Sequence, residues 1–437
     1  GTDIITTGHS RVDIRGQRSG CTSGSGCTGT AWVTLATWDI NPQPTGPALN
    51  TKTPNLSAVC DGQAVSATIS AGSGGAGCTD VYQYSYDGSG TWNIYTPGTD
   101  IITTGHNRVD IRGQRSGCTA GSGCTGTAWV TLATWDVVPQ PTGPALDTKS
   151  PNLAAVCDGQ VVSATFTAGT GGVGCSDSFQ YRLDGTGSWF DYTSGSPIVT
   201  SGRTFVEIRG SRVGCTPGSG CTGSTPVTLV TWTVNPYPVL TSTQNPSPIC
   251  SGSGFSYDPV STVPSTVFAW TRAALPGILP SADGSGNGNP NETLVNTTPD
   301  PITVRYQFTL TANGCTNSTV FNVDVVVKPM PVLSSSLTPA PVCSGSLFNY
   351  SPLSLTTGTG FQWTRAEIAG IEPSGSASGT GDPAETLTNT TLSPVTVNYI
   401  YRLTANGCTN PSDFNVSVAV NPTADVVQPG DQVVCNA

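Results

Sequence analysis

The chain has 437 residues, of which only 10% are charged, and it contains 53 glycines, 34 prolines and 15 cysteines. This composition is typical of short strands joined by turns and lacks the charge-patterned amphipathic segments of helices, so it predicts an all-β protein. The formal net charge of −10 excludes the basic surface that nucleic acid or an anionic membrane would need.

The first part of the chain is an internal repeat. Cys21, Cys118 and Cys215 lie 97 residues apart, and the residues around them are nearly the same in the first two copies. Each complete copy opens with Pro-Gln-Pro-Thr-Gly-Pro-Ala-Leu, which predicts a short, stiff joint between neighbours. We name this repeat the type A module. It is expected at 1–43 (its back half only), 44–140 and 141–237.

Polar and apolar residues alternate within the type A module, which predicts half-buried antiparallel strands. The alternating stretches are Ala64–Ile69, Val81–Tyr86, Arg108–Arg112 and Ala128–Trp135. Asp87-Gly88 and Asp184-Gly185 fall between such stretches, where Asp-Gly favours a hairpin turn. A calcium loop is the alternative interpretation of these residues, but its ligand spacing is incomplete.

A different module, which we name type B, follows with a period of 93 residues. Trp270 corresponds to Trp363 and Tyr306 to Tyr399, and apolar residues alternate on both sides of Asn313-Gly314, as expected for the final hairpin of a β-sandwich. The type B modules are expected at 238–330 and 331–422, and the start of a further repeat at 423–437.

The type B motifs carry a resemblance to a known family. Pro-x-Cys-Ser-Gly, Trp-Thr-Arg-Ala, Asp-Pro-Ala-Glu-Thr-Leu at 382–387 and Leu-Thr-Ala-Asn-Gly-Cys-Thr resemble the PKD-like, immunoglobulin-like repeats of giant surface proteins in the Bacteroidota. Val-Cys-Asp-Gly-Gln and Val-Asp-Ile-Arg of type A resemble partner repeats of the same class, which includes gliding-motility adhesins exported by type IX secretion. The resemblance implies tandem immunoglobulin-like sandwiches, end to end as an elongated rod.

Cysteines at fixed module positions, outside any CxxC spacing, predict structural disulfides made in an oxidising compartment. In a standard immunoglobulin-like sandwich, Cys250 and Cys315 lie at opposite ends, roughly 25–30 Å apart. A disulfide requires Cα atoms within about 7 Å. The cysteines expected in disulfides are Cys60, Cys78, Cys118, Cys124, Cys157, Cys175, Cys215, Cys221, Cys250, Cys315, Cys343 and Cys408.

Two pairing schemes remain open at this point. In the first, the lower end of one module is stapled to the upper end of the next, which joins Cys250 to Cys408 and Cys157 to Cys315. In this scheme two of Cys78, Cys118 and Cys124 pair locally and one is left for the module before. In the second scheme the pairs are Cys250–Cys315, Cys343–Cys408 and Cys118–Cys124, all within one module.

Few residues suggest binding or catalysis. Charged residues alternate on one strand of type A and form a candidate ligand ladder or a merely solvated sheet face; they are Asp110, Arg112 and Arg115, and Glu207, Arg209 and Arg212. Trp129 and Trp135 are six residues apart, which predicts that they share one face, either in the core or as a sugar-stacking platform. His9 and His106 have no catalytic or metal-binding partners in the sequence and are expected at the surface.

The sequence therefore predicts no catalytic residue, no cofactor and no enzyme in this segment. We expect a structural stalk of a long extracellular, cell-surface adhesin or filament, acting by extension and multivalency on extracellular surfaces or glycans, or with other copies of itself. The alternatives are carbohydrate-binding accessory modules of a secreted hydrolase and a self-assembling extracellular fibre. Ligand, full length, oligomeric state and glycosylation stay open.

Overall fold

The computed structural model describes residues 2–424 and 430, and these residues form strands and loops without a helix. The predicted all-β class is therefore confirmed. The chain divides into two compact units, Gly1–Val234 and Asn235–Ala437, which are described separately. Most of the final stretch, 423–437, lies outside the described residues, so the further repeat predicted there stays a prediction.

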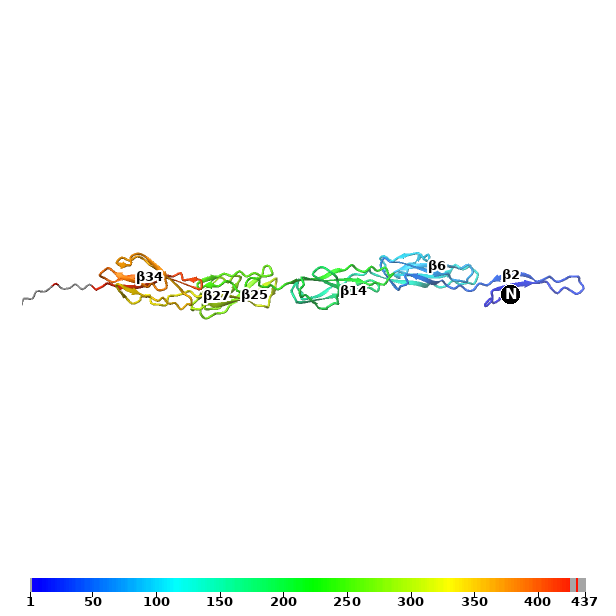
Figure 1. Ribbon diagram of the computed structural model, residues 1–437. Coiled ribbons are helices and arrows are strands. Elements are labelled where there is room, and N and C mark those ends of the chain that lie inside the picture. The colour runs from blue at the N-terminus through cyan, green and yellow to red at the C-terminus, as the bar shows by residue number, and fades with distance from the viewer. Residues whose placement is uncertain (1, 425–429, 431–437) are drawn as a thin grey trace, which may run out of the picture. The chain divides into compact units, whose positions relative to one another are not determined.

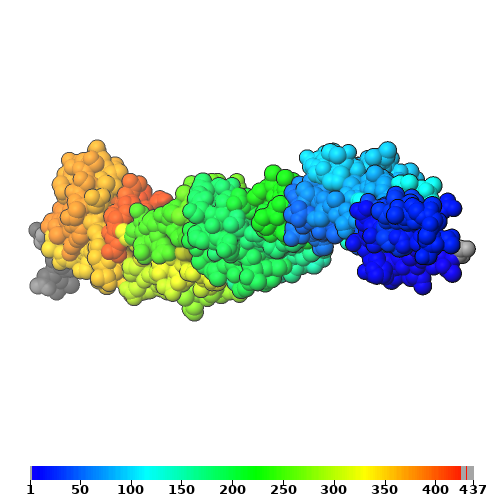
Figure 2. All heavy atoms as spheres, turned by 90° about the vertical axis from the view of Figure 1, so that its right-hand side faces the viewer, coloured from blue at the N-terminus to red at the C-terminus, as the bar shows by residue number. Residues whose placement is uncertain are grey.

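The first unit begins with a single hairpin. Its two antiparallel strands are β1 (Arg11–Gly16) and β2 (Val33–Asp39). Trp38 on this hairpin is 52% exposed, whereas the corresponding Trp135 is fully buried, because no second sheet among the described residues packs on the hairpin. Figure 2 shows the atoms of this segment in dark blue.

Two sandwiches of the same topology complete the first unit (Figure 1). A three-stranded sheet of order β3-β5-β8 faces a five-stranded sheet of order β4-β10-β9-β6-β7. The strands are β3 (Ala48–Thr53), β4 (Ala58–Cys60), β5 (Ala64–Ser70), β6 (Thr79–Tyr86), β7 (Asn93–Ile94), β8 (Ile101–Ile102), β9 (Arg108–Ser116) and β10 (Val130–Val138). Those of the second sandwich are β11 (Ala145–Ser150), β12 (Ala155–Cys157), β13 (Val161–Thr167), β14 (Ser176–Leu183), β15 (Phe190–Asp191), β16 (Ile198–Val199), β17 (Phe205–Val213) and β18 (Val227–Asn235).

The second unit also holds two sandwiches, each with a three-stranded and a six-stranded sheet. The first contains β19 (Ile249–Cys250), β20 (Ser253–Phe255), β21 (Val267–Arg272), β22 (Ile278–Leu279), β23 (Gly284–Asn287), β24 (Glu292–Asn296), β25 (Ile302–Ala312), β26 (Cys315–Thr316) and β27 (Phe321–Lys328). The other contains β28 (Val342–Cys343), β29 (Ser346–Phe348), β30 (Gly360–Arg365), β31 (Ile371–Glu372), β32 (Ala377–Thr380), β33 (Glu385–Asn389), β34 (Val395–Ala405), β35 (Cys408–Thr409) and β36 (Phe414–Asn421).

Every sandwich is closed by the same strand pair. A two- or three-residue strand near its start pairs in parallel with its last long strand, as β4 does with β10 and β28 with β36. The long strands otherwise pair antiparallel, and the polypeptide reverses at tight turns. Asp87 and Gly88 have φ values of 56° and 63°, the left-handed geometry of the predicted hairpin turn.

The type A core follows the predicted alternation but breaks it in β10. Val109, Ile111 and Trp135 are fully buried between the sheets. A β-bulge at Leu132 shifts the register between Thr131 and Ala133. The prediction that Trp129 and Trp135 share one face was therefore wrong, because the extra residue turns Trp129 to the outer face while Trp135 stays in the core.

The type B core is built around a buried charge pair. Arg272 is 2% exposed, and its guanidinium donates to both carboxylate oxygens of Glu292 at 2.9 and 3.1 Å. The Tyr306 hydroxyl donates to the same carboxylate at 2.6 Å. Arg365, Glu385 and Tyr399 repeat this arrangement in the next sandwich. Every member has a partner, which is the condition for tolerating a charge in a core.

Replacing Arg272 with methionine is expected to lower the free energy of unfolding of its sandwich by about 3–5 kcal/mol, because the half-buried carboxylate of Glu292 would keep only the Tyr306 hydroxyl as a partner. Hydrogen-exchange protection of β25 measures the loss, and β34 in the neighbouring sandwich is the internal reference. Arg305→Met removes the exposed pair with Asp324 and should cost at most about 1 kcal/mol. Equal losses in both variants would contradict this assignment.

The same pair predicts a pH dependence. Burial raises the pKa of Glu292, but hydrogen bonds from Arg272 and Tyr306 outweigh it and hold the pKa below the ordinary 4.5. The ionised carboxylate therefore stabilises the fold above the unfolded-state pKa, and this contribution is lost as the pH falls through the folded-state pKa. Protection factors in β24 should fall in that acidic range, and the fall should be smaller in Glu292→Gln. An identical pH profile in both proteins would refute this role.

Candidate functional site

The feature that recurs in both units is the junction between consecutive modules. In the first unit Cys60, the last residue of β4, forms a disulfide with Cys221, which precedes β18 of the next sandwich, and their Cα atoms are 5.0 Å apart. The backbone N–H of Cys60 also donates to the carbonyl of Ser219 at 2.8 Å. The start of one sandwich is thus covalently attached to a loop of the following one.

A glutamine of the proline-rich joint supports this junction. The Gln140 side chain donates to the carbonyls of Asp61 and Gly220 at 2.9 and 3.0 Å, and its oxygen accepts from the N–H of Thr222 at 3.1 Å. These contacts connect the joint with the sandwich on either side of it. Gln43 makes the equivalent bonds in the preceding joint, to Gly123 and Thr125. Sequence reasoning missed this role, although the repeated Pro-Gln-Pro of both joints was a usable signal.

A glycine permits the close approach at the junction. Gly220 has a φ of +72°, and a Cβ atom on it would overlap the side-chain oxygen of Gln63 in the other sandwich. Gly218 in the same loop has a similar φ of +76° but no neighbour within 4 Å of such a Cβ. Gly220 is therefore required both by the turn and by the neighbouring module, and Gly218 by the turn alone.

The junction of the second unit is also closed by a disulfide between consecutive sandwiches, but at different positions in the module. Cys250, which ends β19, is bonded to Cys408, which begins β35 of the next sandwich, with Cα atoms 5.7 Å apart. Lys328, the last residue of β27, donates from Nζ to the carbonyl of Asn406 at 2.8 Å. The start of one sandwich again meets the final hairpin of the following one.

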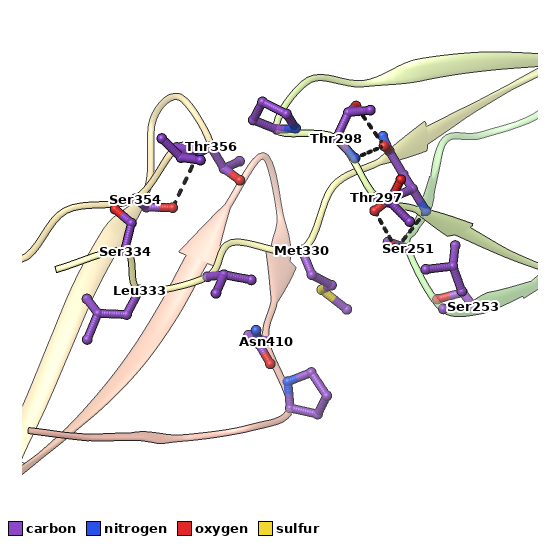
Figure 3. Close-up of a pocket in the computed structure, with 17 residues that line it drawn as sticks. Ser251, Ser253, Thr297, Thr298, Met330, Leu333, Ser334, Ser354, Thr356 and Asn410 are labelled. Carbon is purple, nitrogen blue, oxygen red and sulfur yellow. Dashed lines mark hydrogen bonds between the residues drawn. The ribbon is translucent and has the colours of Figure 1, made fainter. Parts of the chain in front are cut away.

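A cavity of about 650 Å³ lies between the two sandwiches of this unit (Figure 3). Ser251 and Thr298 line it from one sandwich and Ser354 and Asn410 from the other, with Met330 in the connecting segment. None of the 17 residues that line it is charged or a histidine. The cavity therefore offers hydrogen-bonding groups and apolar surface but no acid, base or nucleophile of perturbed pKa.

Four disulfides decide between the two pairing schemes for the residues that they join. Cys250–Cys408 is the pair expected for a staple between modules, and it excludes the intra-module pairs Cys250–Cys315 and Cys343–Cys408. Cys78–Cys118 and Cys175–Cys215 are local bonds with Cα separations of 3.9 Å, which excludes Cys118–Cys124. Cys157 and Cys315 are also disulfide-bonded, and the proposal that they bond to each other stays a prediction.

The prediction of disulfides at Cys124 and Cys343 needs correction, because both have free thiols, as Cys21 and Cys27 do. Cys124 is equivalent to Cys221, and the staple scheme assigns it a cysteine 97 residues before Cys60. Cys343 is equivalent to Cys250, and its assigned partner lies 93 residues after Cys408. Neither position falls within this sequence, so no partner is within reach.

The candidate ladder is largely occupied by contacts within its own module. Asp110 is 8% exposed and accepts from Arg108 and Thr134. The Arg112 guanidinium lies between the rings of Trp92 and Trp129, at 3.7 and 4.2 Å from their centres. It also donates to Gln83, and burial lowers the pKa of this arginine. The guanidinium of Arg112 and the carboxylate of Asp110 are therefore already engaged within the module, and little of either group is accessible to a ligand.

The other ladder residues behave in the same way. Arg115 pairs with Asp80 at 3.1 Å and Arg212 with Asp177 at 2.9 Å. Glu207 is buried and paired with Arg182, and Arg209 stacks on Trp189 at 4.0 Å. A ligand-binding role for these residues stays untested, and their geometry accounts for each of them as part of the sheet face.

The histidine positions differ in their surroundings. His9 is exposed on the hairpin segment, whereas His106 stacks on Tyr86 and contacts Asp87 at 2.8 Å. Its hydrogen bond lowers the pKa of Asp87, whose other oxygen accepts from the N–H of Asn107. The Asp87 side chain thus stabilises the turn in which it lies by bonding to residues 106 and 107. Within residues 2–424 and 430, no group of three or more His, Cys, Asp or Glu residues could hold a metal ion.

Comparison with known proteins supports the fold. A PKD-like domain model matches residues 247–331, the first sandwich of the second unit. No curated protein matches the chain in sequence. Among the described residues no helix is long and apolar enough to cross a membrane.

Several solved multidomain structures are similar to the chain at low sequence identity. The chain is similar to the ICAM-5 D1–D4 ectodomain fragment, at 12% identity over 86% of this chain and 99% of that one, with a TM-score of 0.33. It is also similar to protocadherin gammaB7 EC3–6, at 12% identity over 84% and 98% with a TM-score of 0.30. A third is a Ca²⁺-stabilised adhesin with which an Antarctic bacterium binds ice, at 12% identity over 86% and 99% with a TM-score of 0.27. The paired sheets of each module and the family match over 247–331 show that the chain is built of tandem β-sandwiches of the immunoglobulin-like and PKD-like kind.

Gly220→Ala is expected to open the first-unit junction, since its Cβ would overlap Gln63. The Cys60–Cys221 bond should then be reduced by dithiothreitol at least several-fold faster, as followed by thiol alkylation and peptide mapping. Gly218→Ala imposes the same φ strain on the same loop without the contact and is the matched control. Equal acceleration in both variants would show that the neighbouring module is not involved.

Proposed function

We propose that this chain is a structural segment of a long extracellular adhesin or filament, in which modules act as spacers joined in series. The observation that carries the proposal is that two module types with different cores are joined by the same kind of covalent junction. A stalk needs such junctions, because each junction must keep its geometry under load.

The compartment fits this role. Ten of the described cysteines are disulfide-bonded, which favours an oxidising, extracellular environment. Attachment to a cell surface, export by type IX secretion and a place in gliding motility are parts of the proposal supported only by the resemblance of the repeats. Extracellular surfaces, glycans or further copies of the filament are the proposed partners of the whole protein.

The alternative function, a carbohydrate-binding accessory module, has less support than the spacer function. Type A aromatic residues on the outer sheet face, Trp92 and Trp129, are stacked on Arg112 and do not form an open coplanar platform. The third copy has Pro226 at the position of Trp129, which removes half of that arrangement.

The test of a spacer is whether added modules add length. We would place the chain between a surface anchor and a fluorescent tag and insert one or two extra copies of residues 44–140 after residue 140, which preserves every junction contact. The height of the tag should increase by equal steps of about 30–40 Å, the length of a 9- to 11-residue strand with its turns. An unchanged height, or a second step much smaller than the first, would refute the spacer function.

A further inference from the structure

The two inter-module disulfides, which we call the staples, join residues far apart in the chain. Cys60 and Cys221 are separated by 161 residues, and Cys250 and Cys408 by 158. The local bonds Cys78–Cys118 and Cys175–Cys215 span only 40 residues each. Each staple therefore encloses almost all of one sandwich and most of the next.

This connectivity determines where a pulling force travels. Force applied to the two ends of the chain follows the shortest covalent path, which runs through the hairpin β1–β2 and then β3 and β4, and crosses at Cys60 to Cys221. It continues along β18 and reaches Cys250, where it crosses to Cys408 and leaves along β36. The residues enclosed by each staple are not on this path.

We propose that the staples carry tension around the modules, so that the enclosed sandwiches stay folded under load, and that thiol reduction of the staples releases their stored length. The proposal rests on the spacer function, because it concerns how such a spacer resists force. It makes the length of the filament under load depend on the redox state of its surroundings.

The strand pairing shows what the staples protect. Without a staple, force on both ends of a sandwich shears the short strand near its start from its last strand, as in the parallel pair β4·β10. The β4·β10 pair has only three residue pairs, Asp136 to Val138 with Ala58 to Cys60. With the staple closed, the load leaves the first sandwich at Cys60, and β10 is not pulled. The short parallel pair is then shielded from shear.

The released length would be large. An extended chain spans about 3.3–3.6 Å per residue, so each staple withholds on the order of 500 Å of contour length. This greatly exceeds the length of the folded modules themselves. Opening a staple therefore changes the chain from a stiff connection to an extensible one, while leaving every peptide bond intact.

The staples are chemically open to a dithiol. Cys221 and Cys250 are half-buried, whereas Cys60 and Cys408 are buried. A thiolate of the dithiol attacks one sulfur of the staple and expels the other as a thiolate, forming a mixed disulfide. The second thiolate of the dithiol displaces the first cysteine. The dithiol is oxidised to its cyclic disulfide, and the two cysteines take up its two protons.

Single-molecule force spectroscopy on the full chain, held by its two ends, tests the proposal. The oxidised protein should release contour length only from segments outside the staples. With dithiothreitol, the released length should increase by on the order of 1,000 Å for the two staples together. If the oxidised protein extends as far as the reduced protein, the staples do not carry the load and the proposal is overturned.

Variants separate the staples from the local disulfides, which dithiothreitol also reduces. Cys60→Ser with Cys221→Ser, and separately Cys250→Ser with Cys408→Ser, should each release additional length without any reductant. For the first pair the increase should be on the order of 300 Å, because Cys78–Cys118 and Cys175–Cys215 lie inside that staple and each still withholds 40 residues. Cys78→Ser with Cys118→Ser is the matched control, because it removes a bond of the same chemistry within one module and should leave the staple-enclosed length withheld. A staple variant that behaves like the unsubstituted protein would overturn the proposal.

The outcome is independent of the insertion experiment, which applies no load. Tag heights that do not add in equal steps would refute the spacer function even if the staples shield the modules. Equal steps together with full extension of the oxidised protein would retain the spacer and refute tension-bearing staples.

Discussion

The structure depends on one distance constraint, the short reach of a disulfide. Two Cα atoms must lie within about 7 Å, whereas the two ends of a sandwich are separated by a whole strand length. Cys250 ends β19, the first strand of its sandwich, and Cys408 begins β35 in the last hairpin of the next sandwich. Because these positions lie at opposite ends of a sandwich, each cysteine bonds to one from another module. A strand-length separation thus directs these two cysteines across the junction, whereas Cys78 and Cys118 lie close together in one module and bond locally.

This rule applies to modules whose interiors differ. The type A core is centred on an uncharged Trp135 packed against Val109 and Ile111, and the type B core on the buried pair of Arg272 and Glu292. Both present a cysteine at the start of one sandwich and another in a late loop or hairpin of the next. The residues that join modules lie at the module ends, so modules with different cores can form the same kind of junction.

Much of this arrangement could be predicted from the sequence because its signals are local. The period-2 stretches became strands, and Asp87-Gly88 became a left-handed turn, since backbone sterics and alternation act within a few residues. The placement of Trp129 could not be predicted. A single bulge residue, Leu132, reverses the face of everything before it, and a bulge leaves no alternation signal of its own.

The candidate ladder is not an open binding site, because other side chains of the same module cover it. Alternation correctly placed Asp110 and Arg112 on the outer face, but it cannot report what comes to lie over that face. Trp92 immediately precedes the edge strand β7 and Trp129 precedes the bulged strand β10, and together they enclose the guanidinium. Contacts between strands distant in sequence decide whether a charged residue binds a partner or completes its own sheet. Contacts between distant segments also decide the junctions. Cys60 and Cys250 have no bonding partner in their own modules, and each forms its disulfide with the module that follows.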